Sequence, residues 1–219
     1  MGNSFQVRSV MERRALFSTA YMPNVAYMAA LAAYEVADIE ACETYPKQTY
    51  RNRCTIVTAN GLLDLTVPVV RPQGNHTATG DTGISYSEPW NVRHWRAIES
   101  AYSASPYFLY YRDGIEQILL SRHDRLIDLN QALLTHLLKK MKIAALTALT
   151  TDFEIPTGRH GDYRGTFTPK RPLSGIGFKP YPQVFQHKMP FYANMSVIDL
   201  LFNMGPEAKQ YLQSLVIAV

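Results

Sequence analysis

The segment before the best-marked β-hairpin of this sequence contains several side chains that could bind an anion. It reads QTYRNRC over residues 48–54. Its candidates for a ligand site are Arg51, Asn52 and Arg53. Two apolar runs follow, 54–59 and 62–69, on either side of Asn60-Gly61, a dipeptide that favours a two-residue type I′ turn. The sequence therefore predicts a cluster of cations at the open end of an apolar hairpin.

The expected register of this hairpin places two guanidinium groups side by side. A two-residue turn pairs Ala59 with Leu62, and strand alternation then puts Arg51 and Arg53 on the same polar face. Their guanidinium groups would lie about 7 Å apart, because strand residues rise roughly 3.3 Å each. Each guanidinium offers a rigid fork of donors, which suits an anionic ligand with several oxygen atoms. Two solvated arginines on an exposed sheet face are the alternative interpretation.

A histidine at the edge of a predicted helix is the candidate general base. The segment from about Trp90 to Ser103 has an apolar stripe at helical spacing, formed by Trp95, Ile98 and Tyr102. His94 falls near the edge of this stripe. An imidazole in that position can be neutral at pH 7 and still reach a ligand, as a general base must. A buried histidine with a purely structural hydrogen bond is the alternative.

Two further segments supply candidate ligand-binding side chains. Residues 107–111 carry four aromatic rings, of which Tyr107 could stack on a sugar or a base, with core packing as the alternative. Residues 156–182 are rich in glycine and in basic side chains. The basic candidates in this segment are Arg164, Lys170 and Arg171. A long loop of this composition is either a lid over a site or an irregular connection.

Composition narrows the class of partner. The chain has 219 residues, of which 47% are hydrophobic and 18% are charged, so it can bury one sizeable core. We expect a flexible tail at 1–12 and one domain over 13–219. The net charge of +4 permits an anionic small molecule as partner, but no run of lysine and arginine marks a nucleic-acid or membrane surface.

Cysteine spacing and nucleotide motifs limit the chemistry that can be predicted. Cys42 and Cys54 have no CxxC or Cys/His metal spacing, so no metal site is predicted. Two thiols in a chain of this size indicate a reducing cytoplasm, and a disulfide between them is the alternative. Neither a Walker-type loop nor GxGxxG is present, so the cofactor stays unknown. The apolar stretch 15–34 resembles a secretory signal, but Pro23-Asn24 interrupts it, and no membrane insertion is expected.

The elements that must position these residues form an α/β pattern. A buried strand at 15–20, a helix capped by Asn24 and a second strand at 36–41 give a βαβ-like start. The other predicted elements are helices at 115–121, 125–142, 197–203 and 206–215 and a strand at 144–151. We therefore expect an α/β fold with a mixed sheet, an antiparallel hairpin, helices packed on the sheet and a helical C-terminal part.

Several blocks of this sequence resemble the WbqC-like protein family, bacterial proteins associated with surface-polysaccharide gene clusters. The blocks extend from about Thr19 to Leu212 and keep their order and spacing. They are Thr19–Pro23, Tyr45–Cys54, Asn60-Gly61 with Leu65–Val69, Trp90 with His94-Trp95, Ser100–Tyr102 with Ser105–Phe108, Asp162–Arg164 with Pro169-Lys170, and Asn194–Pro206. One position departs from the family pattern, because Phe17-Ser18-Thr19 stands where many members carry His-Gln-Pro.

The resemblance implies a part in O-antigen or related glycan synthesis, such as transfer of glycine to an amino sugar. It favours a cytoplasmic transferase acting on a nucleotide-linked amino sugar, in which His94 takes the proton of the attacking amine. Four cations would hold the diphosphate: Arg51, Arg53, Lys170 and Arg171. Tyr107 would offer a stacking surface. A non-catalytic sugar-nucleotide or partner-binding protein of glycan assembly is the alternative, and nucleic-acid binding is not favoured.

Overall fold

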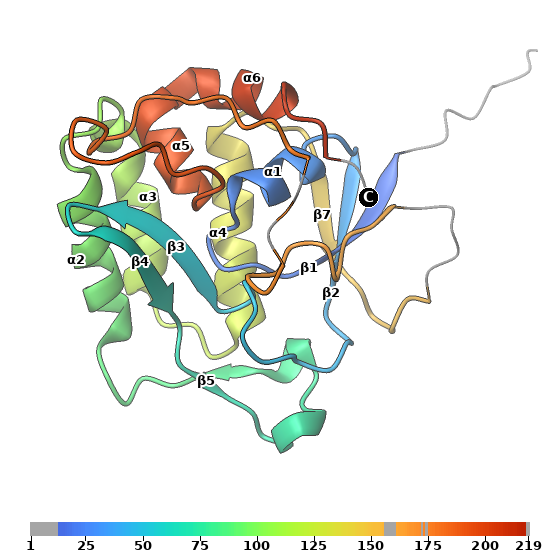
Figure 1. Cartoon of the computed structure of the whole chain (residues 1–219). Helices are drawn as coiled ribbons and strands as arrows, with labels where there is room; N and C mark the ends of the chain where they lie inside the picture. The colour runs from blue at the N-terminus through green and yellow to red at the C-terminus, as the bar shows by residue number, and fades with distance from the viewer. Residues whose placement is uncertain (1–12, 156–160, 172, 174, 218–219) are drawn as a thin grey trace, which may run out of the picture.

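The protein is built on a parallel sheet of four strands in the order β7-β2-β1-β8 (Figure 1). The computed structural model describes residues 13–155, 161–171, 173 and 175–217. The strands of the sheet are β1 (Arg14–Ser18), β2 (Val36–Glu40), β7 (Leu146–Leu149) and β8 (Gly161–Asp162). The predicted α/β class is confirmed, whereas the predicted tail at 1–12 lies outside the described residues.

The first strand, helix and second strand follow from their apolar sequence. β1 and β2 pair in parallel and are joined by α1 (Val25–Leu31), every residue of which is buried. Asn24 caps this helix, because its Oδ1 accepts a hydrogen bond of 2.9 Å from the Tyr27 N–H. The ring of Tyr27 in turn packs on Phe17 of β1, with 5.2 Å between centroids. The predicted βαβ start is therefore confirmed.

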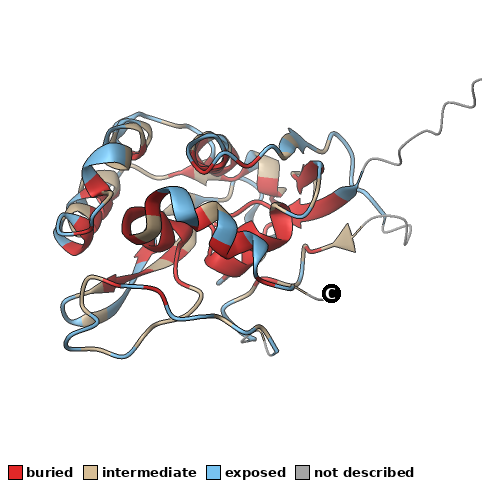
Figure 2. Ribbon diagram, turned by 90° about the horizontal axis from the view of Figure 1, so that it is seen from above, coloured by how far each residue is buried: buried red, intermediate tan, exposed pale blue. Residues whose placement is uncertain are grey.

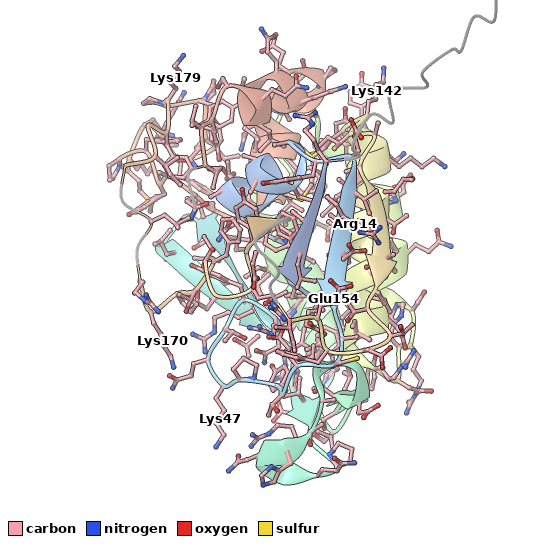
Figure 3. All side chains as sticks on the ribbon, turned by 90° about the vertical axis from the view of Figure 1, so that its right-hand side faces the viewer. Arg14, Lys47, Lys142, Glu154, Lys170 and Lys179 are labelled. Atoms are coloured by element: carbon pink, nitrogen blue, oxygen red, sulfur yellow. The ribbon has the colours of Figure 1, made fainter. Side chains whose placement is uncertain are left out.

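The remaining helices build the core around this unit. They are α2 (Trp90–Tyr102), α3 (Phe108–Leu120), α4 (Leu126–Lys140), α5 (Val197–Met204) and α6 (Ala208–Gln213), with a short 3₁₀ turn at Gly205–Glu207. α1 and α4 lie on the same face of the sheet, and Figure 3 looks onto the opposite face. Buried positions, red in Figure 2, gather where the helices meet the sheet and one another. None of the described helices is both long and apolar enough to cross a membrane.

α3 begins earlier than the sequence predicts. The predicted helix covers 115–121, whereas α3 starts at Phe108 and takes up most of the aromatic cluster. Phe108 is buried and Tyr110 is 76% exposed, so the turn of the helix sends these rings to different sides. The interior Gly114 weakens the helical signal, yet the fold needs it, because a Cβ there would lie 2.0 Å from the ring of His136.

The hairpin forms a separate two-stranded sheet whose predicted register is wrong by two residues. β3 (Arg53–Thr58) pairs with β4 (Gly61–Thr66), and Thr58 rather than Ala59 closes the ladder opposite Gly61. The positive φ angle, +105°, belongs to Gly61, which is already the first residue of β4. Since the shift is an even number of residues, side chains keep their predicted faces, and Cys54 remains in the core.

Three short strands form outside the main predicted elements. β5 (Val69–Val70) pairs with β6 (Gly83–Ile84), and two 3₁₀ turns, Gly74–His76 and Thr79–Asp81, lie between them. Within the predicted lid or connection, β8 pairs in parallel with β1. β8 has only two residues and therefore no periodic sequence signal, so it was not predicted. Residues 156–160, 172 and 174 of the predicted lid lie outside the described part of the chain.

Candidate functional site

The carboxyl ends of the parallel strands bring several loops together at one edge of the sheet. β2 pairs with β1 on one side, and β8 pairs with β1 on the other side. In open α/β sheets, ligands bind in the crevice outside the carboxyl ends of the strands, where the connections diverge. The candidate site therefore consists of the side chains at the carboxyl ends of β1 and β8 and the loops beside them.

Arg51 lies at this edge rather than on the hairpin. It precedes β3, and only 6% of its side chain is exposed. Its Nη2 donates a hydrogen bond of 2.5 Å to Ser18 Oγ, and its Nε donates one of 3.0 Å to Glu43 Oε1. The guanidinium therefore connects the end of β1 with the loop after β2.

Arg164 holds the end of β8 in a similar way. Its Nε and Nη2 donate to the two carboxylate oxygens of Asp162 at 3.0 and 2.7 Å, and its Nη1 donates to Glu40 Oε2 at 2.9 Å. The hydrogen bonds to Arg164 lower the pKa of Asp162. The carbonyl oxygen of Arg164 also accepts a hydrogen bond of 2.8 Å from Ser18 Oγ. Ser18 thus joins the two arginines.

Glu40 is the fully buried carboxylate of this cluster. Its Oε1 accepts hydrogen bonds of 2.8 Å from Thr150 Oγ1 and from the Cys42 N–H. These bonds and the Arg164 pair offset the large cost of removing a carboxylate from water. Three carboxylates, those of Glu40, Glu43 and Asp162, thus face two guanidinium groups. This charge balance does not favour a phosphate at Arg51 or Arg164.

Two cavities adjoin the cluster. The smaller one lies between the ends of β1 and β8 and measures about 10 Å³, which is room for about one water molecule. Its lining includes Ser18, Arg51 and Arg164. The larger one measures about 360 Å³ and shares Tyr50 and Phe167 with the smaller. The other side chains that line it are Asn24, Thr168, Pro169, Arg171, Leu173, Phe178, Ala193, Asn194 and Met195. A ligand of small-molecule size could therefore reach the carboxyl edge of the sheet.

The predicted pair of neighbouring guanidinium groups is not formed. Arg51 points to the sheet edge, whereas Arg53 lies in β3 with its Nη1 3.6 Å from a carboxylate oxygen of Asp64. The two side chains separate because the ladder starts at Arg53, and the residues before it turn instead of continuing the strand. The Nδ2 of Asn52 donates to the Val67 carbonyl at 2.9 Å and so extends the hairpin.

The basic and aromatic candidates from the later segments lie in two places. Arg171 lines the larger cavity, and Lys170 is an exposed neighbour in the turn that a bridge between Thr168 and Arg171 closes. Tyr107 packs instead against Gly205, where an added Cβ would meet the tyrosine ring at 2.5 Å. Its position is that of a packing residue at the start of α3.

His94 is a buried residue of α2 that faces the hairpin, and it is not part of the lining of either cavity. Its Nδ1 lies 2.9 Å from the hydroxyl of Tyr21, and its ring meets Trp90 edge-on. Burial lowers the pKa of His94 to about 4, although a hydrogen bond to the backbone of Thr66 acts in the opposite direction. The imidazole is neutral at pH 7, and the cavity lining that contains Arg51 contains neither Arg53 nor His94.

The acidic members of the cluster were not predicted. Glu40 is the last residue of the buried strand β2, Glu43 lies in the loop just after it, and Asp162 ends β8. The usable signal is the position of these residues, because the carboxyl ends of parallel strands meet at one edge. Sequence analysis alone placed Asp162 in a loop, so its contact with β1 had no local signal.

Comparisons with known proteins identify the family of this chain. A family model described as the WbqC-like protein family matches residues 19–164, which is more than half of the chain. The uncharacterized protein Rv1507c of Mycobacterium tuberculosis (strain ATCC 25618 / H37Rv) is 28% identical over 231 aligned residues, which cover 93% of this chain and 98% of that protein. No solved structure matches the chain. The chain therefore belongs to the WbqC-like protein family.

Proposed function

We propose that this protein is a transferase of surface-polysaccharide biosynthesis that moves a small acyl or aminoacyl group onto a nucleotide-linked amino sugar. The observation that carries the proposal is the cavity of about 360 Å³ that shares Tyr50 and Phe167 with the small cavity at the carboxyl ends of β1 and β8. Its volume lies within the range of small-molecule sites, roughly 300–1,000 Å³. Its walls combine aromatic and apolar side chains with one guanidinium and two amides, a mixture that suits a sugar joined to an anionic group.

Each kind of side chain in this cavity has a place in the proposal. Arg171, with Lys170 beside it, receives the diphosphate, because neither side chain has an ion pair among the described residues. Tyr50 and Phe167 offer ring faces for the sugar. The Oδ1 of Asn194 accepts a hydrogen bond of 2.9 Å from the Ala26 N–H, which leaves its amide protons to donate to sugar hydroxyls.

The buried cluster supports the cavity instead of touching the diphosphate. Arg51 holds the turn that carries Tyr50, and the Tyr21 N–H donates to the Tyr50 carbonyl at 2.9 Å. His94 bonds to the hydroxyl of Tyr21, so it reaches the cavity only through other residues. We therefore assign Arg51 and His94 positioning roles. In the transfer itself, the sugar amine attacks the acyl carbon and the new C–N bond forms, the bond from that carbon to the leaving group of the donor breaks, and the amine proton leaves with the departing group.

Binding of a sugar nucleotide is the first test. A nucleotide sugar at 100 times its dissociation constant should stabilise the fold by about 2.7 kcal/mol, which a thermal-shift screen detects. In the Arg171→Ala variant the dissociation constant should rise about 10- to 100-fold, because a hydrogen bond to a charged group is lost. The matched control is Arg96→Ala, which removes the same charge from an exposed position on α2. Equal affinity in both variants, or no stabilisation by any nucleotide sugar, would contradict the proposal.

A non-catalytic sugar-nucleotide-binding protein is the second candidate. The observation that favours it is that Arg51, Arg164 and His94 are all engaged in hydrogen bonds inside the protein. Incubation with a nucleotide-linked amino sugar and acyl or aminoacyl donors, followed by mass spectrometry, separates the two candidates. A product heavier by the acyl group supports the transferase, and binding without product supports the second candidate.

A further inference from the structure

β7 is an edge strand of the parallel sheet with one unpaired side. Within the described residues it pairs with β2 alone. The Leu146 N–H donates to the Glu35 carbonyl, and the Thr150 N–H donates to the Ile39 carbonyl. Because the backbone direction alternates along a strand, the N–H and C=O groups of Thr147 and Leu149 point away from β2.

Two features that often prevent edge strands from pairing, charged residues and proline, are absent from this edge. β7 reads Leu-Thr-Ala-Leu and contains neither a charged residue nor proline. Leu146 is 67% exposed and Leu149 is 38% exposed. Two more exposed apolar side chains follow in the next segment, Ile155 at 76% and Phe153 at 55%, although the guanidinium of Arg164 lies over the Phe153 ring. Exposed apolar side chains beside an unpaired strand are typical of an interaction site.

We propose that two copies of this chain pair through β7 in an antiparallel, two-fold symmetric arrangement. The register follows from the outward groups. Thr147 lies opposite Leu149 of the second copy, and Ala148 lies opposite Ala148 on the two-fold axis. Only this register pairs all the outward groups of β7 with β7 itself. The two sheets then form one continuous sheet.

The charges on either side of β7 fit an antiparallel partner. Before the strand come exposed basic residues: Lys139, Lys140 and Lys142. After it come exposed acidic residues: Asp152 and Glu154. Figure 3 shows Lys142 near the top of the view and Glu154 well below it, near the middle. In the proposed pair the basic end of each β7 faces the acidic end of the other, which brings Lys142 and Glu154 of the second copy to the same end of the pair.

The other edge of the sheet explains why pairing stops at two copies. β8 has two residues, Gly161–Asp162, and Arg164 just beyond it bonds back to Asp162 and Glu40. Such a short, charged edge does not accept a further strand. A two-fold contact through β7 uses the same surface on both copies and is therefore closed.

The test is the mass of the full-length chain in solution, measured by light scattering after size exclusion and by sedimentation. We expect a dimer for the wild type and a monomer for Ala148→Lys, because two lysines would face each other on the axis. Ala59→Lys, at an exposed position of the hairpin turn, is the matched control and should stay dimeric. A monomeric wild type, a larger oligomer, or an Ala148→Lys dimer would overturn the proposal.

A cysteine variant tests the register even if Ala148→Lys fails to fold. Residues opposite each other in a non-hydrogen-bonded antiparallel pair have Cα atoms about 4.5 Å apart, which a disulfide can bridge. Ala148→Cys in a Cys42→Ser background should form a disulfide-linked dimer on mild oxidation. Gln186→Cys, also exposed but outside the 142–155 segment, should not. Equal cross-linking of both variants would overturn the register.

The charge pairing has its own control. Lys142→Glu should raise the dimer dissociation constant roughly fivefold, since it places like charges together twice in the symmetric dimer. Lys142→Glu combined with Glu154→Lys should restore the wild-type value. A double variant that is as weak as the single variant would show that these residues do not meet.

Discussion

Ser18 shows how one small side chain can position two cations. Its hydroxyl accepts a hydrogen bond from the buried guanidinium of Arg51 and donates one to the backbone carbonyl of Arg164, whose side chain is half-buried. Arg51 in turn holds the turn that contains Tyr50, and Tyr50 lines both cavities. The geometry of the proposed site therefore depends on a residue that is 8% exposed and has no charge.

Removal of this hydroxyl should destabilise the protein. In Ser18→Ala a buried guanidinium loses an acceptor and a buried carbonyl loses a donor, so the free energy of unfolding should fall by about 1–3 kcal/mol. Urea denaturation followed by circular dichroism measures the change. Ser87→Ala, at an exposed position, is the control and should stay within about 0.5 kcal/mol of the wild type. A Ser18→Ala variant as stable as this control would show that the hydroxyl does not join the two arginines.

His94 should make stability depend on pH. Burial lowers its pKa in the folded protein to about 4, below the ordinary value of 6.5, so the unfolded chain takes up the proton first as pH falls. The stabilisation is complete above pH 6.5 and is lost as pH falls towards 4. Between pH 7 and pH 5 the free energy of unfolding should decrease by about 2 kcal/mol through this group alone.

The measurement compares urea denaturation of the wild type and of His94→Gln at pH 7 and pH 5. The variant should lose this part of the pH dependence, because glutamine does not titrate. His187→Gln is the control, since His187 is exposed. Identical pH dependence in wild type and His94→Gln would disprove the neutral buried imidazole.

In the β3–β4 hairpin the strand pairing differs from the prediction, but the buried face does not. The turn residues Ala59 and Asn60 precede Gly61, which adopts φ +105° and opens β4. The observed register differs from the predicted one by two residues, and Cys54 and Ile56 are buried as predicted. The predicted pairing is therefore wrong while the predicted buried face is right. A difference of one residue instead of two would have exchanged the two faces.

This turn makes Gly61 sensitive to substitution. A Cβ at positive φ is strained, so Gly61→Ala should lower the free energy of unfolding by about 1–2 kcal/mol, although an added Cβ has no neighbour within 4 Å. Thermal unfolding measures the effect. Gly165→Ala is the matched control, because it also has open space and no positive φ angle and should change stability little. Equal effects at both positions would show that the φ angle is not the cause.

Segments far apart in the chain build the walls of the larger cavity. Tyr50 precedes the hairpin, Phe167 follows β8, and Phe178 and Asn194 lie in the segment before α5. Asp199 of α5 anchors that segment, since its Oδ2 accepts hydrogen bonds from the Tyr181 hydroxyl at 2.6 Å and the Gln183 side chain at 2.8 Å. The cavity therefore forms only when these separate segments of the chain pack together.

The proposed site and the proposed dimer edge lie at different places on the same sheet. The site lies where β1 meets β8, and the dimer edge is the free side of β7, with β2 between them. Pairing through β7 therefore leaves the cavity open to solvent. Binding and association can be tested independently, because Arg171 lies in the cavity and Ala148 lies on the edge.

Local sequence pattern determined most of the elements of this protein. The apolar strand β1, the Asn24 cap, the buried α1 and the stripe of Trp95, Ile98 and Tyr102 on α2 all follow from short-range periodicity and capping. These features could be predicted because the residues that decide them are at most a few turns apart in the chain.

The tertiary structure alone decided where the functional side chains point. Arg51 reaches Ser18 across 33 positions of sequence, and Arg164 reaches Glu40 across 124. Such pairs form because a buried charge must find a hydrogen-bond partner or an opposite charge, and which one it finds depends on which strands meet at the sheet edge. The chain itself specified the cations, and the packing of β8 against β1 decided that they support a cavity instead of facing solvent.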